Sequence, residues 1–270
     1  MENNNSMEKI KTLRERSGAG IVECKKALEE AGDDIEKAVE ILRKKGITKA
    51  AKRSGREACE GIILVETNEQ NNEGYILEIN SETDFVARNE QFQGFAENVL
   101  DIIKKNKPKD LDELMSLPME DGSVKETLEN LSGTIGEKLG IKRFDILLGL
   151  TIISYSHMGG RIGVLVSLNK ADESELAKDI AMQIAAANPK YITPGEVPAE
   201  EINKEKEIYT EQLKKEGKPE NIIEKILEGK INKYFEDVCL VEQEFIKDDK
   251  KRVKDILGEV KVEKFIRYSL

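Results

Sequence analysis

The stretch Ser81-Glu82-Thr83-Asp84-Phe85-Val86-Ala87 lies where the chain changes from a strand pattern to a helix pattern. The run Tyr75–Ile79 leads into it and is predicted to form a strand. After it, apolar residues recur at the spacing of one buried helix face, and these are Phe92, Phe95, Ala96, Val99, Ile102 and Ile103. A polar turn that carries an acid and an aromatic therefore joins two predicted core elements.

Two interpretations of this turn are open from the residues alone. In the first, Thr83 or Asp84 caps a short helical turn, and Asn89 caps the long helix that follows. Phe85 then folds into the core. In the second, the turn presents Asp84 and Phe85 together to a partner, because element junctions often carry function and a rigid aromatic ring is a common interface anchor.

Length and composition limit the class of protein. With 270 residues, the chain has room for about two domains. It carries 43 Lys and Arg against 53 Asp and Glu, a net charge of −10, which disfavours binding along a nucleic-acid backbone. Cys24, Cys59 and Cys239 are widely spaced and are expected to be reduced thiols of a cytoplasmic protein. The N-terminus has no signal pattern, and no apolar run is long enough for a membrane span.

Sequence signals for catalysis are missing. The one histidine, His157, stands beside two glycines and argues against His-based metal sites and against a catalytic triad. The sequence contains no GxxxxGK[ST] loop, so no nucleotide triphosphate site of that kind is predicted. We therefore expect no enzyme activity, no metal and no cofactor.

Residues 7–46 are predicted to form a module of three short helices. Ser17-Gly18-Ala19-Gly20 ends the first helix, Gly32 ends the second, and Gly46 ends the third. The third helix opens at Asp33-Asp34-Ile35-Glu36, which has the signature of a capping box. About 40 residues make a module that is marginally stable by itself.

Nucleic-acid binding by this region has little support. A helix-turn-helix reader of DNA needs base-contacting side chains at the start of its last helix, where this chain has the acids Asp34 and Glu36. A run of cations without an intervening acid follows the module, and it consists of Lys44, Lys45, Lys49, Lys52, Arg53 and Arg56. It is interpreted either as a solvated helical linker or as a docking strip for an acidic partner surface. Direct RNA binding through Lys44–Arg56 is a minor third alternative.

A pattern of two strands followed by a helix occurs twice. In the first copy, residues 62–67 and 75–79 flank a polar turn and form a hairpin. In the second copy, Leu147–Tyr155 is predicted to be one long strand, His157–Gly160 a turn, and Arg161–Leu168 the returning strand. Each copy is expected to be a layer of antiparallel sheet covered by helix.

The two copies provide an internal comparison. Aligning Tyr75–Ile79 on Ile162–Val166 gives an offset of 87 residues, which places Ala171-Asp172 opposite Asp84-Phe85. A helix is predicted from about Asp172. Because the second copy has no aromatic at this position, the fold does not require one there, and this weakens the interpretation of Phe85 as a core residue.

The C-terminal third is predicted to contain a helical hairpin. Residues 198–216 and 220–235 form two helices around Gly217-Lys218-Pro219. Their apolar stripes must pack on each other, on another chain or on the body of the protein. A short helix near Val253–Leu257 and a closing strand over Val262–Tyr268 follow.

These elements predict an α+β fold with four parts. Residues 1–55 form the three-helix module and its basic linker, and residues 56–146 form the first core subdomain. Residues 147–194 and 236–270 form the second core subdomain, into which the helical hairpin of residues 195–235 is inserted.

Three motifs of this sequence resemble the translation elongation factor Ts family. They are Leu13-Arg14-Glu15-Arg16-Ser17-Gly18-Ala19-Gly20 with Cys24-Lys25-Lys26-Ala27-Leu28, the turn Thr83-Asp84-Phe85-Val86-Ala87, and Gly160-Arg161-Ile162-Gly163-Val164. The likeness runs in order through essentially the whole chain. It implies that the chain is a guanine-nucleotide exchange factor for elongation factor Tu, that residues 7–46 are a ubiquitin-associated-like domain, and that the 198–235 hairpin is a dimerisation element.

The resemblance also implies three groups of residues that bind the GDP-bound form of Tu. The first group wedges between helices of Tu and dislodges the Mg²⁺ that holds GDP, and it comprises Thr83, Asp84, Phe85 and Val86. The second belongs to the N-terminal module and comprises Arg14, Gly18, Ala19, Gly20, Ile21 and Val22. The third lies at the second core turn and comprises His157, Gly160 and Arg161. No membrane and no direct nucleic-acid partner is expected.

The chain departs from the family pattern in three places. Ile21-Val22 stand where the family often has two Met, so an apolar contact is expected with altered packing. The turn after His157 is one residue longer than in some members, and the chain ends soon after its closing strand, without an additional C-terminal helix found in some members. The alternative function is a non-catalytic scaffold, in which residues 7–46 bind a partner and the repeats only hold the module.

Overall fold

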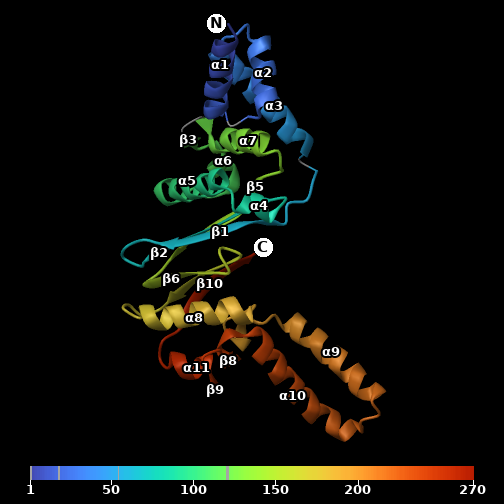
Figure 1. Ribbon diagram of the computed structural model, residues 1–270. Helices are drawn as coiled ribbons and strands as arrows, with labels where there is room; N and C mark the ends of the chain where they lie inside the picture. The colour runs from blue at the N-terminus through green and yellow to red at the C-terminus, as the bar shows by residue number, and fades with distance from the viewer. Residues whose placement is uncertain (1, 18, 54, 120–121) are drawn as a thin grey trace. The chain divides into compact units, whose positions relative to one another are not determined.

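The computed structural model describes the chain apart from residues 1, 18, 54 and 120–121, and the side chains of residues 2–5, 47–52 and 221 also lie outside the description. Figure 1 shows the predicted α+β fold, with three helices first and antiparallel sheets with helices after them. The chain divides into two compact units. The first contains residues 1–64 and 77–144 with Leu270, and the second contains residues 65–76 and 145–269.

Three helices form the predicted N-terminal module: α1 (Glu2–Ser17), α2 (Ile21–Glu30) and α3 (Ile35–Arg53). Their apolar residues make one small core, whose buried members are Ile10, Leu13, Ala19, Cys24, Ala27, Leu28 and Ala38. Asp34 caps α3, since its Oδ1 accepts the N–H of Lys37 at 3.2 Å. The predicted end of the third helix at Gly46 is wrong, because α3 continues to Arg53.

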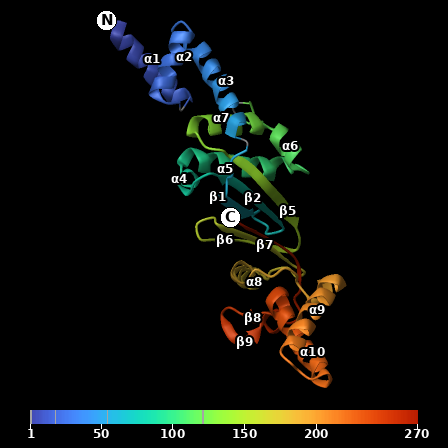
Figure 2. The ribbon, with the colours of Figure 1, turned by 90° about the vertical axis from the view of Figure 1, so that its right-hand side faces the viewer.

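Inside α3, Gly46 lies close to a second helix. A Cβ atom built on Gly133 of α7 (Val124–Ile135) would lie 2.7 Å from the Cα of Gly46, so only glycine fits at this crossing. Figure 2 shows the C-terminal half of α3 against α7. This close helix–helix contact therefore requires glycine at position 133, whereas a Cβ atom on Gly46 would have only an ordinary contact of 3.8 Å with the Cα of Gly133.

The first sheet has the strand order β1-β2-β5, with β1 (Glu60–Thr67), β2 (Glu73–Ser81) and β5 (Gly140–Leu148). The central strand β2 is buried along most of its length, including the carboxylate of Glu78. Lys142 and Arg143 of β5 each contact this carboxylate at 2.7 Å. The two cations compensate the charge of this buried acid, which would otherwise be unpaired in the interior.

Helices follow β2 in the order α4 (Asp84–Ala87), α5 (Glu90–Asn106), α6 (Leu111–Ser116) and α7, with the two-residue strands β3 (Pro118–Met119) and β4 (Gly122–Ser123) before α7. Asn89 caps α5 as predicted, because its Oδ1 accepts the N–H groups of Gln91 and Phe92. The buried face of α5 consists of Phe92, Phe95, Ala96, Val99, Leu100 and Ile103. α7 begins with a capping box between Ser123 and Glu126.

The second sheet has the order β10-β7-β6, with β6 (Thr151–His157), β7 (Ile162–Leu168) and β10 (Val262–Ser269), all antiparallel. Helix α8 (Ser174–Ala187) packs on it and buries Ala177, Ile180, Ala181 and Ile184. The predicted single strand Leu147–Tyr155 is wrong. The chain leaves β5 after Leu148 and starts β6 at Thr151, because Gly149 and Leu150 form a connection between the two strands.

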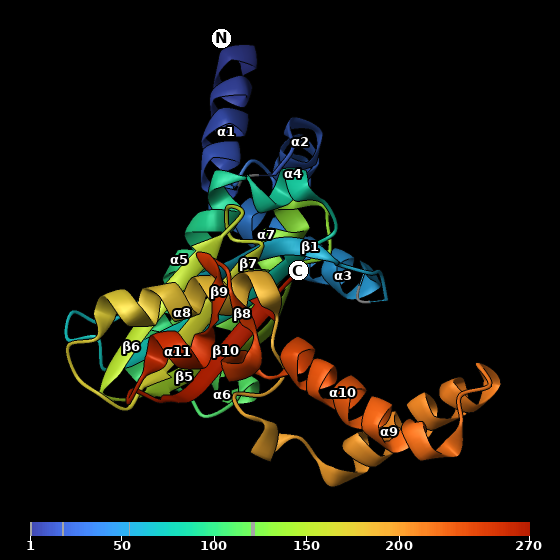
Figure 3. The ribbon, with the colours of Figure 1, turned by 90° about the horizontal axis from the view of Figure 1, so that it is seen from below.

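The remaining chain consists of short elements and one helical hairpin. The short elements are the 3-10 turns η1 (Pro194–Glu196) and η2 (Leu240–Glu242), β8 (Glu244–Phe245), β9 (Asp248–Arg252) and α11 (Val253–Leu257). The hairpin pairs α9 (Ala199–Lys215) with α10 (Glu220–Val238), as Figure 3 shows in orange. Leu213, Ile223 and Ile231 are buried, so much of the two predicted apolar stripes is covered within the protein itself. None of the helices in the described residues is both long and apolar enough to cross a membrane.

Candidate partner-binding site

Phe85 lies on the surface, in the four-residue helix α4, with 82% of its surface exposed. Its neighbour Val86 is buried and occupies the inward position of the turn. The interpretation that places Phe85 in the core is therefore wrong. Complete burial of such a side chain stabilises by about 1.5–3 kcal/mol, so the turn presents a ring that a partner would gain by covering.

Thr83 fixes the turn through its backbone and its hydroxyl. Its N–H donates to Oε2 of Glu137 at 3.0 Å, and its hydroxyl donates to Oε1 of the same carboxylate at 2.8 Å. The hydroxyl oxygen also accepts the N–H of Val86 at 3.5 Å, so Thr83 rather than Asp84 is the cap of α4. Asp84 instead forms an exposed ion pair with Arg88 at 3.1 Å.

Glu82 holds the same turn from the other side. Its Oε1 accepts the backbone N–H of Lys138 at 2.6 Å and lies 3.1 Å from the guanidinium of Arg56. The hydrogen bond from Lys138 is the larger cause, and Arg56 the smaller one, that keep the pKa of the Glu82 carboxyl below its usual range. Glu82 is therefore ionised at neutral pH, when it accepts these hydrogen bonds most strongly.

The N-terminal module exposes a short apolar surface at the start of α2. Ile21 and Val22 are 55% and 66% exposed, directly after Gly20, which is the N-cap residue of the helix. Arg14 and Gly20 are exposed as well, whereas Ala19 is buried in the module core. Gly18, which the resemblance places in this group, lies outside the described residues.

The second core turn differs from its predicted form. His157 is the last residue of β6, not part of the turn, which instead runs from Met158 to Arg161. Met158, Gly159 and Gly160 have φ values of 53°, 65° and 87°, and two successive glycines make this left-handed backbone accessible. The exposed His157 stacks on Tyr155, with ring centroids 5.9 Å apart, and its Nδ1 is 3.1 Å from the Tyr155 hydroxyl. Arg161 is also exposed, while Gly160 is buried.

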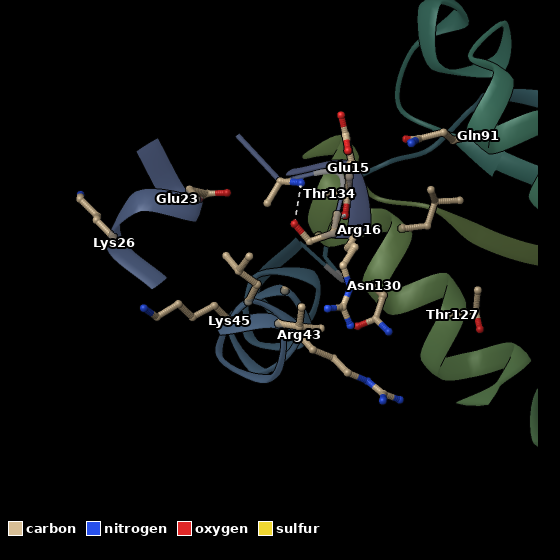
Figure 4. Close-up of a pocket in the computed structure, with 17 residues that line it drawn as sticks. Glu15, Arg16, Glu23, Lys26, Arg43, Lys45, Gln91, Thr127, Asn130 and Thr134 are labelled. Atoms are coloured by element: carbon tan, nitrogen blue, oxygen red, sulfur yellow. Dashed lines mark hydrogen bonds between the residues drawn. The ribbon is translucent and has the colours of Figure 1, made fainter. Parts of the chain in front are cut away.

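A groove of about 780 Å³ lies in the first unit, between the module and α7 (Figure 4). Among its charged lining residues, Arg16 pairs with Glu36 at 2.7 Å and Arg43 with Glu126 at 3.3 Å, and Glu15 and Lys45 are in ion pairs as well. Neither Phe85 nor His157 is among the residues that line it. The groove therefore belongs to the docking of the module on α7 and is separate from the predicted contact residues.

The sequence interpretation missed the residues that hold the α4 turn. Glu137 and Lys138 are more than 50 positions from Thr83, and no local pattern marks them. The basic strip gave a partial signal, since two of its cations form hydrogen bonds within the protein. Arg56 contacts Glu82, and Arg53 donates to the carbonyl oxygen of Ser132 at 2.9 Å. The side chains of Lys49 and Lys52 lie outside the described residues.

Among the described residues, no three side chains of His, Cys, Asp or Glu lie together in a way that could hold a metal ion. What the site offers is an exposed aromatic ring, a rigidly held turn and separate exposed apolar side chains on the module. These are the features of a surface that binds another protein.

Comparison with known proteins shows the relatives of this chain. Residues 82–270 match the family model described as Elongation factor TS. Over 282 aligned positions, the chain is 44% identical to the Elongation factor Ts of Prosthecochloris aestuarii, with 98% of each chain covered. It is 47% identical over 282 positions to the Elongation factor Ts of a Nitratiruptor species, with 98% of this chain and 92% of the relative covered. The family model includes the Thr83 turn, and the two relatives extend the match to nearly the whole chain.

Proposed function

This chain belongs to the elongation factor Ts family, a family of translation elongation factors, and we propose that it is the guanine-nucleotide exchange factor of elongation factor Tu. It would bind Tu·GDP and promote the release of GDP so that GTP can bind. The observation that carries the proposal is the exposed ring of Phe85 on a turn whose backbone is held by Glu82 and Glu137. Such a turn can enter a partner without first being ordered, which reduces the entropy cost of binding.

The proposed mechanism removes Mg²⁺ from the GDP site of Tu. Phe85 and the adjacent Asp84 enter between helices of Tu, and the rearrangement dislodges the ion. The ion is the largest local charge at a bound diphosphate, so its loss weakens GDP binding strongly. Factor and nucleotide then weaken each other's binding to Tu, which is negative coupling.

The energies are compatible with this mechanism. A thousandfold acceleration of GDP release requires a barrier lower by about 4 kcal/mol. Burial of the Phe85 ring supplies about 1.5–3 kcal/mol of that. The remainder would come from the other contact groups, Ile21 and Val22 on the module and His157 and Arg161 at the second core turn.

The predicted parts of the chain receive corresponding roles. Residues 1–55 would bind Tu through α2, and the subdomains 56–146 and 147–194 with 236–270 would carry the two core contacts. The hairpin of residues 195–235 would mediate self-association. Its exposed Ile208 and Ile222 support this, although most of its apolar stripe is covered within the protein. Translation elongation takes place in the cytoplasm, so the proposed function implies that location.

The test is the release of fluorescent GDP from purified Tu with and without this chain. The proposal expects acceleration that saturates with the concentration of the chain, and it is wrong if release stays at the spontaneous rate. Co-purified proteins provide a second readout. A single GTPase partner supports exchange, mixed partners would support the scaffold alternative, and bound RNA would support a role for the basic strip.

A chelator tests the Mg²⁺ mechanism by itself. GDP release is measured with excess Mg²⁺ and with EDTA, for the wild type and for the double variant Asp84→Ala/Phe85→Ala. Two routes to the same loss of Mg²⁺ should not add, so the difference between the two proteins should shrink in EDTA. A difference of the same size under both conditions would contradict metal dislocation while leaving exchange intact.

A further inference from the structure

Two carboxylates join the α4 turn to the chain that follows α7. Glu82 accepts the backbone N–H of Lys138 at 2.6 Å, and Glu137 accepts the backbone N–H of Thr83 at 3.0 Å. Each segment therefore supplies one carboxylate and one backbone donor to the other. We call these four residues the reciprocal clamp. Hydrogen bonds to an ionised carboxylate are about twice as strong as neutral ones, so the clamp is a stiff connection.

Of the two carboxylates in the clamp, Glu137 is the one that binds Thr83 directly. Both of its carboxylate oxygens are engaged, one by the Thr83 N–H and the other by the Thr83 hydroxyl. The hydroxyl is thereby oriented with its oxygen toward the N–H of Val86, which begins α4. Glu137 thus fixes the backbone and the side chain of the residue that caps the helix carrying Phe85.

Helix α4 needs such support because it is very short. It has four residues, whereas isolated helices shorter than about 12–15 residues are marginal in water. Val86 is its only buried residue, so packing anchors the helix at one point. The orientation of the exposed Phe85 ring therefore depends on hydrogen bonds at the cap more than on burial.

Glu137 is itself held in place. Helix α7 ends at Ile135, and its C-cap residue Gly136 turns the chain away with a φ of 90°. The hydroxyl of Ser132 donates to the carbonyl oxygen of Glu137 at 2.6 Å. The same last turns of α7 contact the N-terminal module. Thr134 donates to the carbonyl oxygen of Ser17 at 3.2 Å, and Gly133 lies against Gly46 of α3. The segment that fixes Thr83 is thus also the segment on which the module docks.

We propose that Glu137 is a positioning residue for nucleotide exchange, which holds α4 so that Phe85 is presented in one orientation and at a fixed place relative to the module. The inference rests on the proposed exchange function. Glu137 touches neither Tu nor nucleotide in this account, and it acts through Thr83 on Phe85. Its removal should therefore lower the maximal rate of exchange more than the apparent affinity for Tu·GDP, which the module and the second core turn also support.

The test compares Glu137→Gln with a matched control, Glu129→Gln, which makes the same change of charge in the middle of α7. Hydrogen exchange of the full-length protein is measured first. Loss of the charged acceptor is expected to speed exchange of the α4 amides by about tenfold, with the control at the wild-type rate. Thr83→Val, which replaces the hydroxyl by a methyl group, should change the same amides and provides a second variant if Glu137→Gln does not fold.

GDP release from Tu is measured next, over a range of concentrations of each variant. The saturating rate of Glu137→Gln is expected to fall by about tenfold, with a smaller change in the half-saturating concentration. In a Phe85→Ala background, Glu137→Gln should have little further effect, because both changes remove the same presented ring. A merely structural role would instead lower stability and add to the effect of Phe85→Ala.

The outcomes separate the inference from the proposed function. A wild-type chain that does not accelerate GDP release overturns the proposed function, and the amide measurement still decides whether Glu137 holds α4. If the wild type accelerates release and Glu137→Gln and Thr83→Val match it in both measurements, the positioning role is wrong. If the loss in Glu137→Gln adds fully to that of Phe85→Ala, Glu137 does not act through Phe85.

Discussion

The chain passes from a central strand into a helix twice, and the two junctions make this connection differently. After β2, the turn contains the extra helix α4, Thr83 caps it, and Phe85 is exposed. After β7, residues 169–173 lead directly into α8, and Asp172 adopts a φ of 62°. Both β2 and β7 are the centres of three-stranded sheets. The connection itself therefore requires neither a short helix nor an exposed aromatic.

The two junctions are also anchored to different things. The second is tied to its own sheet, since Thr151 donates to the carbonyl oxygen of Lys170 at 2.7 Å and Asn169 accepts the N–H of Lys261 at 2.8 Å. The first is tied by the reciprocal clamp to the end of α7, on which the module docks. A structural feature present at only one of two equivalent positions is not explained by the fold, and at the first junction this feature is the presentation of Phe85.

The largest expected effect on stability comes from a pair of phenylalanines seven positions apart. Phe92 is fully buried in α5, so Phe92→Ala should cost about 3–5 kcal/mol of unfolding free energy. Phe85→Ala is expected to change it by no more than about 0.5 kcal/mol, as is usual for surface substitutions. Urea unfolding followed by circular dichroism measures both. A cost for Phe85→Ala close to that for Phe92→Ala would show that the first junction needs its aromatic for folding.

A smaller effect is expected at the caps of the two helices. Asn89 accepts two N–H groups of α5, at 2.9 and 3.3 Å, so Asn89→Ala should destabilise by about 1 kcal/mol. In the described part of the chain, α8 has no side-chain cap at Glu173, so Glu173→Ala should stay within about 0.5 kcal/mol of the wild type. An equal loss of unfolding free energy in Asn89→Ala and Glu173→Ala would contradict the proposal that only the first junction has a side-chain cap.

The smallest effect is the pH dependence of the unfolding free energy, which is expected to have opposite sign at the two junctions. The pKa of Glu82 is lowered from 4.5, chiefly by the N–H of Lys138, so its contribution is present above pH 4.5 and is lost as pH falls through the lowered value. The pKa of Lys170 is raised from 10.5, chiefly by its hydrogen bond with Glu173. Its contribution is therefore present below pH 10.5 and is lost as pH rises through the raised value.

Stability curves measured against pH check both signs. The stability difference between the wild type and Glu82→Gln should shrink in acid, and that between the wild type and Lys170→Gln should shrink in alkali. A Glu82→Gln difference that stays constant as the pH falls well below 4.5, the ordinary pKa of this carboxyl, would mean that the charge of Glu82 does not support the first junction.

Most elements of the fold could be predicted because their signals are local. Asn89 marked the start of α5, the apolar spacing from Phe92 onward marked its buried face, and the 87-residue offset paired two strands that are both central in their sheets. The errors occurred where tertiary structure overrides a local signal. Gly46 lies inside a helix that packs closely on Gly133 of α7 rather than ending that helix, and the apolar run over Leu147–Tyr155 belongs to two strands of different sheets.

The candidate site was predictable only in part. The exposure of Phe85 followed from the comparison of the two copies, in which Ala171-Asp172 take the equivalent place. The residues that hold the turn could not be predicted in this way. Glu137 contacts Thr83 across 54 residues of sequence and has no periodic or capping signal of its own. The sequence also gave no indication that the end of α7 contacts the module while Glu137, just after the helix, holds the turn.

The central claim is that the first junction exists to present Phe85 to Tu, and the most direct test is GDP release with Phe85→Ala. Fluorescent GDP bound to Tu is mixed with wild-type or variant protein at equal, saturating concentrations, and the unfolding curve of each protein is recorded in the same buffer. Loss of an interface anchor worth about 2 kcal/mol or more predicts a rate of release lower by about thirtyfold or more. The unfolding curve should coincide with that of the wild type. A variant that accelerates release as well as the wild type would contradict the account.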